Sequence, residues 1–228
     1  AADVTFADGA DIITASAGTS NFRAGVNAGN SIESGGNYNV VIGDEAGTAI
    51  TTGDNNVAVG YVALDANTTA SNNTAIGRYS LTANTTGASN TAVGSGSLGA
   101  NTTASYNTAL GFTALGANTT GASNVAIGNQ SLLNTTTASY NAGVGYQALY
   151  ANTTGSRNTG TGAYAFRFNT TGSDNTASGH QSLYKNTTAS YNTAFGASAL
   201  HENTTASNNT AVGYQAGYSG TTGSPNEY

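Results

Sequence analysis

From Asn39 onward, the hydrophobic and polar positions of this chain recur with a period of 17 residues, without insertion or deletion. Counted from a landmark Asn at position 0, each unit has a small residue at +2 in most cases, a large apolar residue at +3 in most cases, Gly at +4 and usually Leu at +8. Two adjacent Thr residues follow at +12 and +13. The landmark residues are Asn39, Asn56, Asn73, Asn90, Asn107, Asn124, Asn141, Asn158, Asn175, Asn192, Asn209 and Asn226. Such a fixed period predicts a repeat architecture, in which each unit buries its apolar face against its neighbours.

The repeated residue types favour β-structure over helix. Gly, Asn and adjacent Thr residues are all poor in helix interiors. In an extended reading of residues 90–94, the side chains of Thr91 and Val93 point to one side, and Ala92 and Gly94 lie on the other. We therefore predict an all-β fold, a parallel β-solenoid of 17-residue coils over residues 39–228, with a second short strand holding the Thr pair.

Stacking of the coils would place equivalent residues above one another at ~4.8 Å, so that Val59, Val93 and Ile127 share one column. The large apolar residues at +3 and the Leu residues at +8 are expected to form a thin core. The small residues at +2 suggest that another backbone packs close to them, and the Gly residues supply positive φ or close approach. The landmark Asn side chains are expected to hydrogen-bond from coil to coil. So thin a core favours oligomerisation, and three chains around one axis is the preferred form.

Residues 1–38 depart from this pattern and predict a β-rich cap or a junction. Gly25 and Ala28 echo Gly43 and Ala46, but at a spacing of 18, so the strict register begins at Asn39. A cap would cover the exposed edge of the first coil. The last coil has no comparable cap, which would permit a filament assembled end to end.

Composition excludes several functions. Only 7% of the residues are charged, the net charge is −6, and there is no basic stripe, so nucleic acid is not expected as a partner. No apolar run approaches ~18 residues, and membrane insertion is not expected. His180 and His201 occupy different positions of their units, without ligand spacing, so we expect no metal or cofactor. No Ser-His-Asp set is suggested by spacing, and we expect no enzyme.

Units such as Asn209-Thr210-Ala211-Val212-Gly213-Tyr214-Gln215 resemble two related groups of proteins. One is the head repeat of trimeric autotransporter adhesins, and the other is the repeat array of bacteriophage tail-fibre proteins. The resemblance covers residues 39–228. It implies a homotrimeric fibre segment that serves as a spacer or in attachment, outside the cell, on a virion tail fibre or a cell surface.

Any receptor contacts are expected at positions +5, +6 and +9, which vary freely between units and should lie at bends. The candidates are Tyr146, Gln147, Tyr150 and Tyr184, and the partner would be a host surface glycan or another receptor. An alternative function is an ice-binding solenoid, in which one of the two columns formed by the adjacent Thr residues faces outward and orders water. Asn-Thr-Thr tripeptides, as at Asn101 and Asn134, are formal glycosylation acceptors, but they recur because the repeat recurs.

Overall fold

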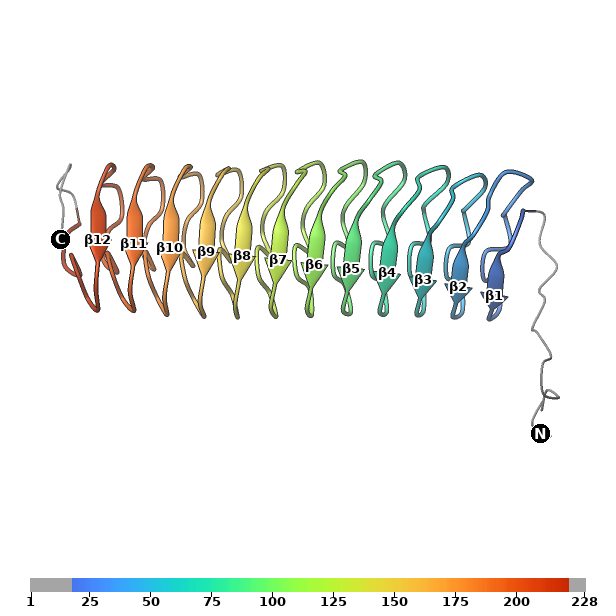
Figure 1. The fold of residues 1–228 in the computed structure, drawn as a ribbon, viewed down its shortest axis with the longest axis horizontal. Coiled ribbons are helices and arrows are strands. Elements are labelled where there is room, and N and C mark those ends of the chain that lie inside the picture. Colours follow the sequence, from blue (N-terminus) through green and yellow to red (C-terminus); the bar gives the residue numbers. More distant parts are fainter. Residues whose placement is uncertain (1–17, 222–228) are drawn as a thin grey trace, which may run out of the picture.

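The computed structural model describes residues 18–221, which form an elongated stack of coils (Figure 1). Each coil contributes one strand of three residues to a single 12-stranded parallel sheet, and the strands follow one another in chain order. No helix occurs within residues 18–221. The prediction of an all-β parallel solenoid is confirmed. The strands are β1 Phe22–Ala24, β2 Val40–Ile42, β3 Val57–Val59, β4 Thr74–Ile76, β5 Thr91–Val93, β6 Thr108–Leu110, β7 Val125–Ile127, β8 Ala142–Val144, β9 Thr159–Thr161, β10 Thr176–Ser178, β11 Thr193–Phe195 and β12 Thr210–Val212.

The register of the sheet follows the sequence repeat. Val59 pairs with Ile76, and Ile76 with Val93, so the predicted stacked column exists. The first pair is shifted by one residue, because Phe22 pairs with Val40 at a separation of 18. The degenerate unit therefore supplies the first coil of the stack, and the rest of the predicted cap, residues 1–17, lies outside the described residues.

Each coil has two walls, a strand wall and a return wall. The chain leaves the strand at the Gly of position +4, passes through a continuous turn and runs back past the Thr pair. The Thr pair lies in a bend, and the predicted second strand is absent from residues 18–221. In most coils the Asn before the pair donates a side-chain hydrogen bond to the carbonyl three residues later, as from Asn152 Nδ2 to Gly155 O at 2.9 Å. This bond supports the bend, but the coils with Ile50 or Thr135 at this position bend in the same way without it.

The interior is narrower than the sequence suggested, and the expectation that the +3 residues form the core is wrong. Those side chains point outward, with Ile76 39% and Phe195 60% exposed. The small +2 residues, such as Ala75 and Ala194, point inward and are fully buried. They pack with Ala or Ser at +7 and with the Leu column at +8, which is also fully buried at Leu98.

Close packing across the two walls explains why small residues recur at +2. A Cβ added at Gly143, in this inward column, would lie 2.6 Å from Ser131 Oγ and 3.2 Å from Leu132 Cγ. The coil that begins at Asn39 has the large and small residues at the opposite positions. Gly47 stands at +8, where most coils have Leu, and the larger Val41 stands at +2, where most coils have a small residue. Volume is thus redistributed within a coil, as close-packed interiors require.

Two buried columns of Asn tie the coils together. In the landmark column, each Oδ1 accepts a hydrogen bond from the backbone N–H of the next landmark Asn, as from Asn107 N to Asn90 Oδ1 at 3.0 Å. The second column stands at +11 and forms a direct amide ladder, as from Asn101 Nδ2 to Asn84 Oδ1 at 2.9 Å. These bonds satisfy polar groups that the narrow interior removes from water.

The amide ladder is interrupted in one coil, at Thr135. Here the Asn stands one residue early, as Asn134, and Thr135 takes the buried position. Both Thr135 Oγ1 and Asn118 Oδ1 are buried without a hydrogen-bond partner. Each such orphaned group costs free energy of folding.

Replacing Thr135 by Asn should therefore stabilise the protein. The new amide can donate to Asn118 Oδ1, and so rejoin the two halves of the ladder. We expect the free energy of unfolding to rise by about 1–2 kcal/mol, measured by urea denaturation at one protein concentration. The exposed Thr137 gives the matched control, since Thr137→Asn should leave stability unchanged. A Thr135→Asn variant no more stable than the wild type would contradict the ladder account.

Candidate functional site

The four predicted contact residues lie in two groups. Tyr146 and Gln147 occupy the turn that follows β8. Tyr146 is 43% exposed, and its ring packs edge-on against Tyr164 with the centroids 5.1 Å apart. Gln147 is only 8% exposed, and its Nε2 donates to Gln130 Oε1 at 2.7 Å. Of this pair, Tyr146 alone presents a substantial surface to a partner.

Tyr150 and Tyr184 belong to a continuous row on the return wall, which we call the aromatic column: Tyr150, Arg167, Tyr184, His201 and Tyr218. The Arg167 guanidinium lies 5.7 Å from the centroid of the Tyr150 ring, and its Nη1 donates to the Tyr184 hydroxyl at 3.1 Å. The Tyr184 and His201 rings stack at 5.0 Å, and the His201 and Tyr218 rings at 4.8 Å. Coil stacking thus turns residues 17 apart into one row of rings.

Beside the aromatic column, position +10 holds Phe168, Lys185 and Glu202 in three successive coils. Lys185 Nζ lies 2.7 Å from Glu202 Oε2. A hydrogen bond from Lys185 holds the pKa of the Glu202 carboxyl below its usual range, and the same bond raises the pKa of Lys185. The two groups therefore form a charged pair at neutral pH, whose charges compensate each other.

These large residues are confined to one end of the stack. In the preceding coils, position +10 is Ala in all but the coil that carries Asn134; these residues are Ala49, Ala66, Ala83, Ala100, Ala117 and Ala151. Position +9 is likewise Gly in two successive coils, at Gly99 and Gly116. The fold therefore accepts small residues at both positions, and stacking does not require the aromatic and charged side chains of the later coils.

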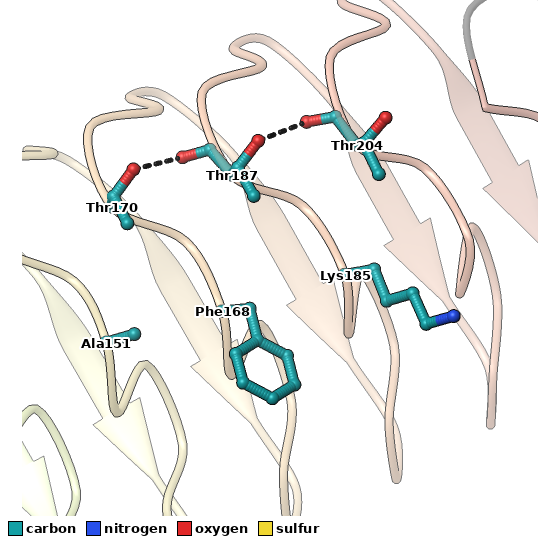
Figure 2. A pocket seen from close by; sticks show the side chains of 6 residues that line it. All are labelled: Ala151, Phe168, Thr170, Lys185, Thr187 and Thr204. Atoms are coloured by element: carbon teal, nitrogen blue, oxygen red, sulfur yellow. Dashed lines mark hydrogen bonds between the residues drawn. The ribbon is translucent and has the colours of Figure 1, made fainter.

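An open groove of about 490 Å³ runs along the return wall at this end (Figure 2). It is lined by Ala151, Phe168, Thr170, Lys185, Thr187 and Thr204. The Thr170 and Thr187 hydroxyls donate to the carbonyls of the next coil, at 3.0 and 3.1 Å. With these hydroxyls directed along the row, the Thr methyl groups are left on the side of Phe168 and Lys185, as Figure 2 shows.

The strand wall presents a different surface, which we call the outer face: the first and third residues of strands β2 to β12. It carries Val, Ile, Leu, Phe, Ala, Thr and Ser, and no charged residue. The exposed ion pairs of the described residues lie elsewhere, at Arg157–Asp174 and Lys185–Glu202. At the first of these, the hydrogen bond from Arg157 lowers the pKa of Asp174.

The Asn residues of the Asn-Thr-Thr tripeptides are buried in the amide ladder, as at Asn101, except for the partly exposed Asn134. Within residues 18–221, no group of three or more His, Cys, Asp or Glu side chains could hold a metal ion. Over the same residues, no helix has the length and apolar character needed to cross a membrane.

Comparisons with protein family models, with curated proteins and with solved structures match nothing to this chain. The function is therefore inferred from the surfaces of the protein. Sequence reasoning identified Tyr150 and Tyr184 separately but missed the column that contains them. The signal was present, because Tyr150, Tyr184 and Tyr218 are separated by multiples of 17 residues.

Proposed function

We propose that this chain is a rigid segment of a homotrimeric extracellular fibre, of the tail-fibre or surface-adhesin kind, that acts as a spacer and offers a receptor-binding surface. The observation that carries the proposal is the uncharged outer face. Parallel sheets almost always have both faces covered. Here the return wall covers one face, while the other leaves Ile76 and Phe195 exposed.

A second copy of the chain is the partner that best suits this face. A repeating surface with a fixed period can match the same surface of an identical chain along its whole length. Contiguous exposed apolar patches on soluble proteins commonly mark such interfaces. The thin interior adds to the argument, because each coil buries few large side chains and gains from burial supplied by another chain. The number three rests on the resemblance of the repeat to trimeric fibres.

The trimer can be tested by placing charge on the outer face. The double variant Ile76→Asp/Ile127→Asp should dissociate the assembly, because buried unpaired carboxylates are costly. Light scattering should show the particle mass falling from about three times to one times the 22.5 kDa chain mass. Both side chains are exposed in the single chain, so circular dichroism should show that the coils remain folded.

The same coils offer a matched control on the return wall. Thr86 and Thr137 are exposed there, and Thr86→Asp/Thr137→Asp introduces equal charge away from the outer face. This variant should keep the wild-type mass. A wild-type protein that is monomeric or dimeric at micromolar concentration would overturn the proposal of a trimer.

The outer face also supports one alternative, an ice-binding surface. Its two outward columns are in strict register over β2 to β12, and the first is rich in Thr, as at Thr91 and Thr108. Such a regular array could order water. Since a trimer would cover this face, the alternative requires a monomer, and thermal hysteresis of the purified protein would distinguish the two. End-to-end filament assembly stays a prediction, which electron microscopy would test.

A further inference from the structure

The last coils of the stack carry side chains that the fold does not require. At position +10 the repeat accepts Ala in six coils, yet Phe168, Lys185 and Glu202 follow one another in the coils that begin at Asn158, Asn175 and Asn192. In a repeat protein, residues required by stacking recur in every unit. A local departure from the repeat that also builds a groove indicates that those residues meet a partner.

We infer that the groove beside Phe168 and Lys185 binds an uncharged oligosaccharide chain, laid along the fibre axis. The inference rests on the proposed function, in that it gives the receptor-binding surface a site and a ligand class. The predicted residue Tyr184 flanks this site, and Tyr146 lies outside it.

The chemistry of the groove suits a sugar chain. Phe168 is 39% exposed and packs edge-on against Tyr184 with centroids 5.0 Å apart, so its ring is held in place. A fixed aromatic ring can stack on the apolar face of a pyranose, and the methyl groups of Thr170 and Thr187 extend that apolar surface. The Lys185–Glu202 pair supplies a donor and an acceptor for hydroxyl groups at the rim.

Charge and backbone bonding disfavour other partners. Lys185 is paired with Glu202, and the neighbouring Arg167 guanidinium, 4.9 Å from the centroid of the Phe168 ring, is a single cation, whereas nucleic acid is bound by several. The backbone groups of the return wall already form hydrogen bonds between coils, as from Thr170 N to Thr187 O at 2.8 Å. An extended peptide therefore could not pair with this wall as an added strand. The groove and the outer face lie on opposite walls, so a trimer closed through the outer face leaves the groove accessible.

The binding can be tested with unbranched six-unit oligomers of glucose (β-1,4 and α-1,4), xylose and N-acetylglucosamine, by isothermal titration on the full chain. We expect at least one of these oligomers to bind. We also expect that oligomer, once bound, to block binding of the others in a competition titration. Phe168→Ala, which installs the residue that the repeat itself uses at this position, should weaken that binding about tenfold, as the loss of one aromatic contact implies. Lys185→Ala should weaken it as well, and raising the salt concentration should change it little.

The control is Tyr106→Ala, which removes a well exposed aromatic side chain from an earlier coil and should leave binding unchanged. The inference is overturned if none of the oligomers binds, if only acidic oligosaccharides bind, or if Phe168→Ala binds as tightly as the wild type. Particle mass, measured on the same samples, separates the two proposals. If the protein is a trimer but binds no oligosaccharide, only the oligosaccharide site is overturned. If the protein is a monomer that binds, the trimer is overturned and the oligosaccharide site stands.

Discussion

Replacing Gly111 by Ala should prevent the stack from folding as a single unit. The backbone of Gly111 has φ +136°, and an added Cβ would lie 2.6 Å from the Gly128 carbonyl oxygen in the next coil. The contact cannot be relieved without separating two coils, and the strained backbone adds to its cost. We expect a loss of more than about 4 kcal/mol in the free energy of unfolding, read from urea denaturation followed by circular dichroism.

The variant Gly213→Ala separates the effect of backbone strain from the effect of the close contact between coils. The φ of Gly213 is +133°, and among the described residues an added Cβ would meet only Ala216 Cβ, at 3.9 Å. Gly213→Ala should therefore cost only the backbone strain, about 1–3 kcal/mol. If the two variants are equally destabilised, the close approach of coils at this column is not what selects Gly.

The second large effect is expected for Asn107→Leu, which replaces a fully buried amide by an apolar group of similar size. Asn107 Oδ1 accepts from Asn124 N at 2.9 Å, and Asn107 Nδ2 donates to Gly121 O at 2.9 Å. The substitution leaves a buried backbone N–H without an acceptor and removes a donor from a buried carbonyl. We expect the free energy of unfolding to fall by about 3–5 kcal/mol.

The exposed Asn129 provides the comparison, because it stands in the neighbouring coil and makes no side-chain hydrogen bond within the described residues. Asn129→Leu should change stability by less than about 0.5 kcal/mol. Similar midpoints for Asn107→Leu and Asn129→Leu in the same denaturation series would show that the landmark column is not needed for stability.

The stacking and its register could be predicted from the sequence, because an uninterrupted period leaves one way to align the coils. The alternation of Ala92 and Val93 across the strand was also readable. What hydrophobicity alone could not decide was which side faces inward. The side chain of Val93 is the more apolar, but the distance between the walls admits Ala92, so volume decides the orientation.

The path of the return wall was less predictable for a related reason. Leu98 and Leu183 have φ of +49° and +48°, a conformation that Leu rarely adopts. The local cost of this backbone is offset by full burial of each side chain. The backbone preferences of the individual residues therefore do not predict these turns, which become stable only in the stacked coils.

The direction of the hydrogen bonds between coils has a mechanical consequence. These bonds run along the long axis, so a pull on the two ends of a chain loads the bonds of the terminal coil first, and coils peel away in turn. Each coil contributes ~4.8 Å to the stack but releases 17 residues, or about 60 Å of extended chain. Under load the chain can therefore lengthen roughly twelvefold, one coil at a time, and each step dissipates energy before the chain is fully extended.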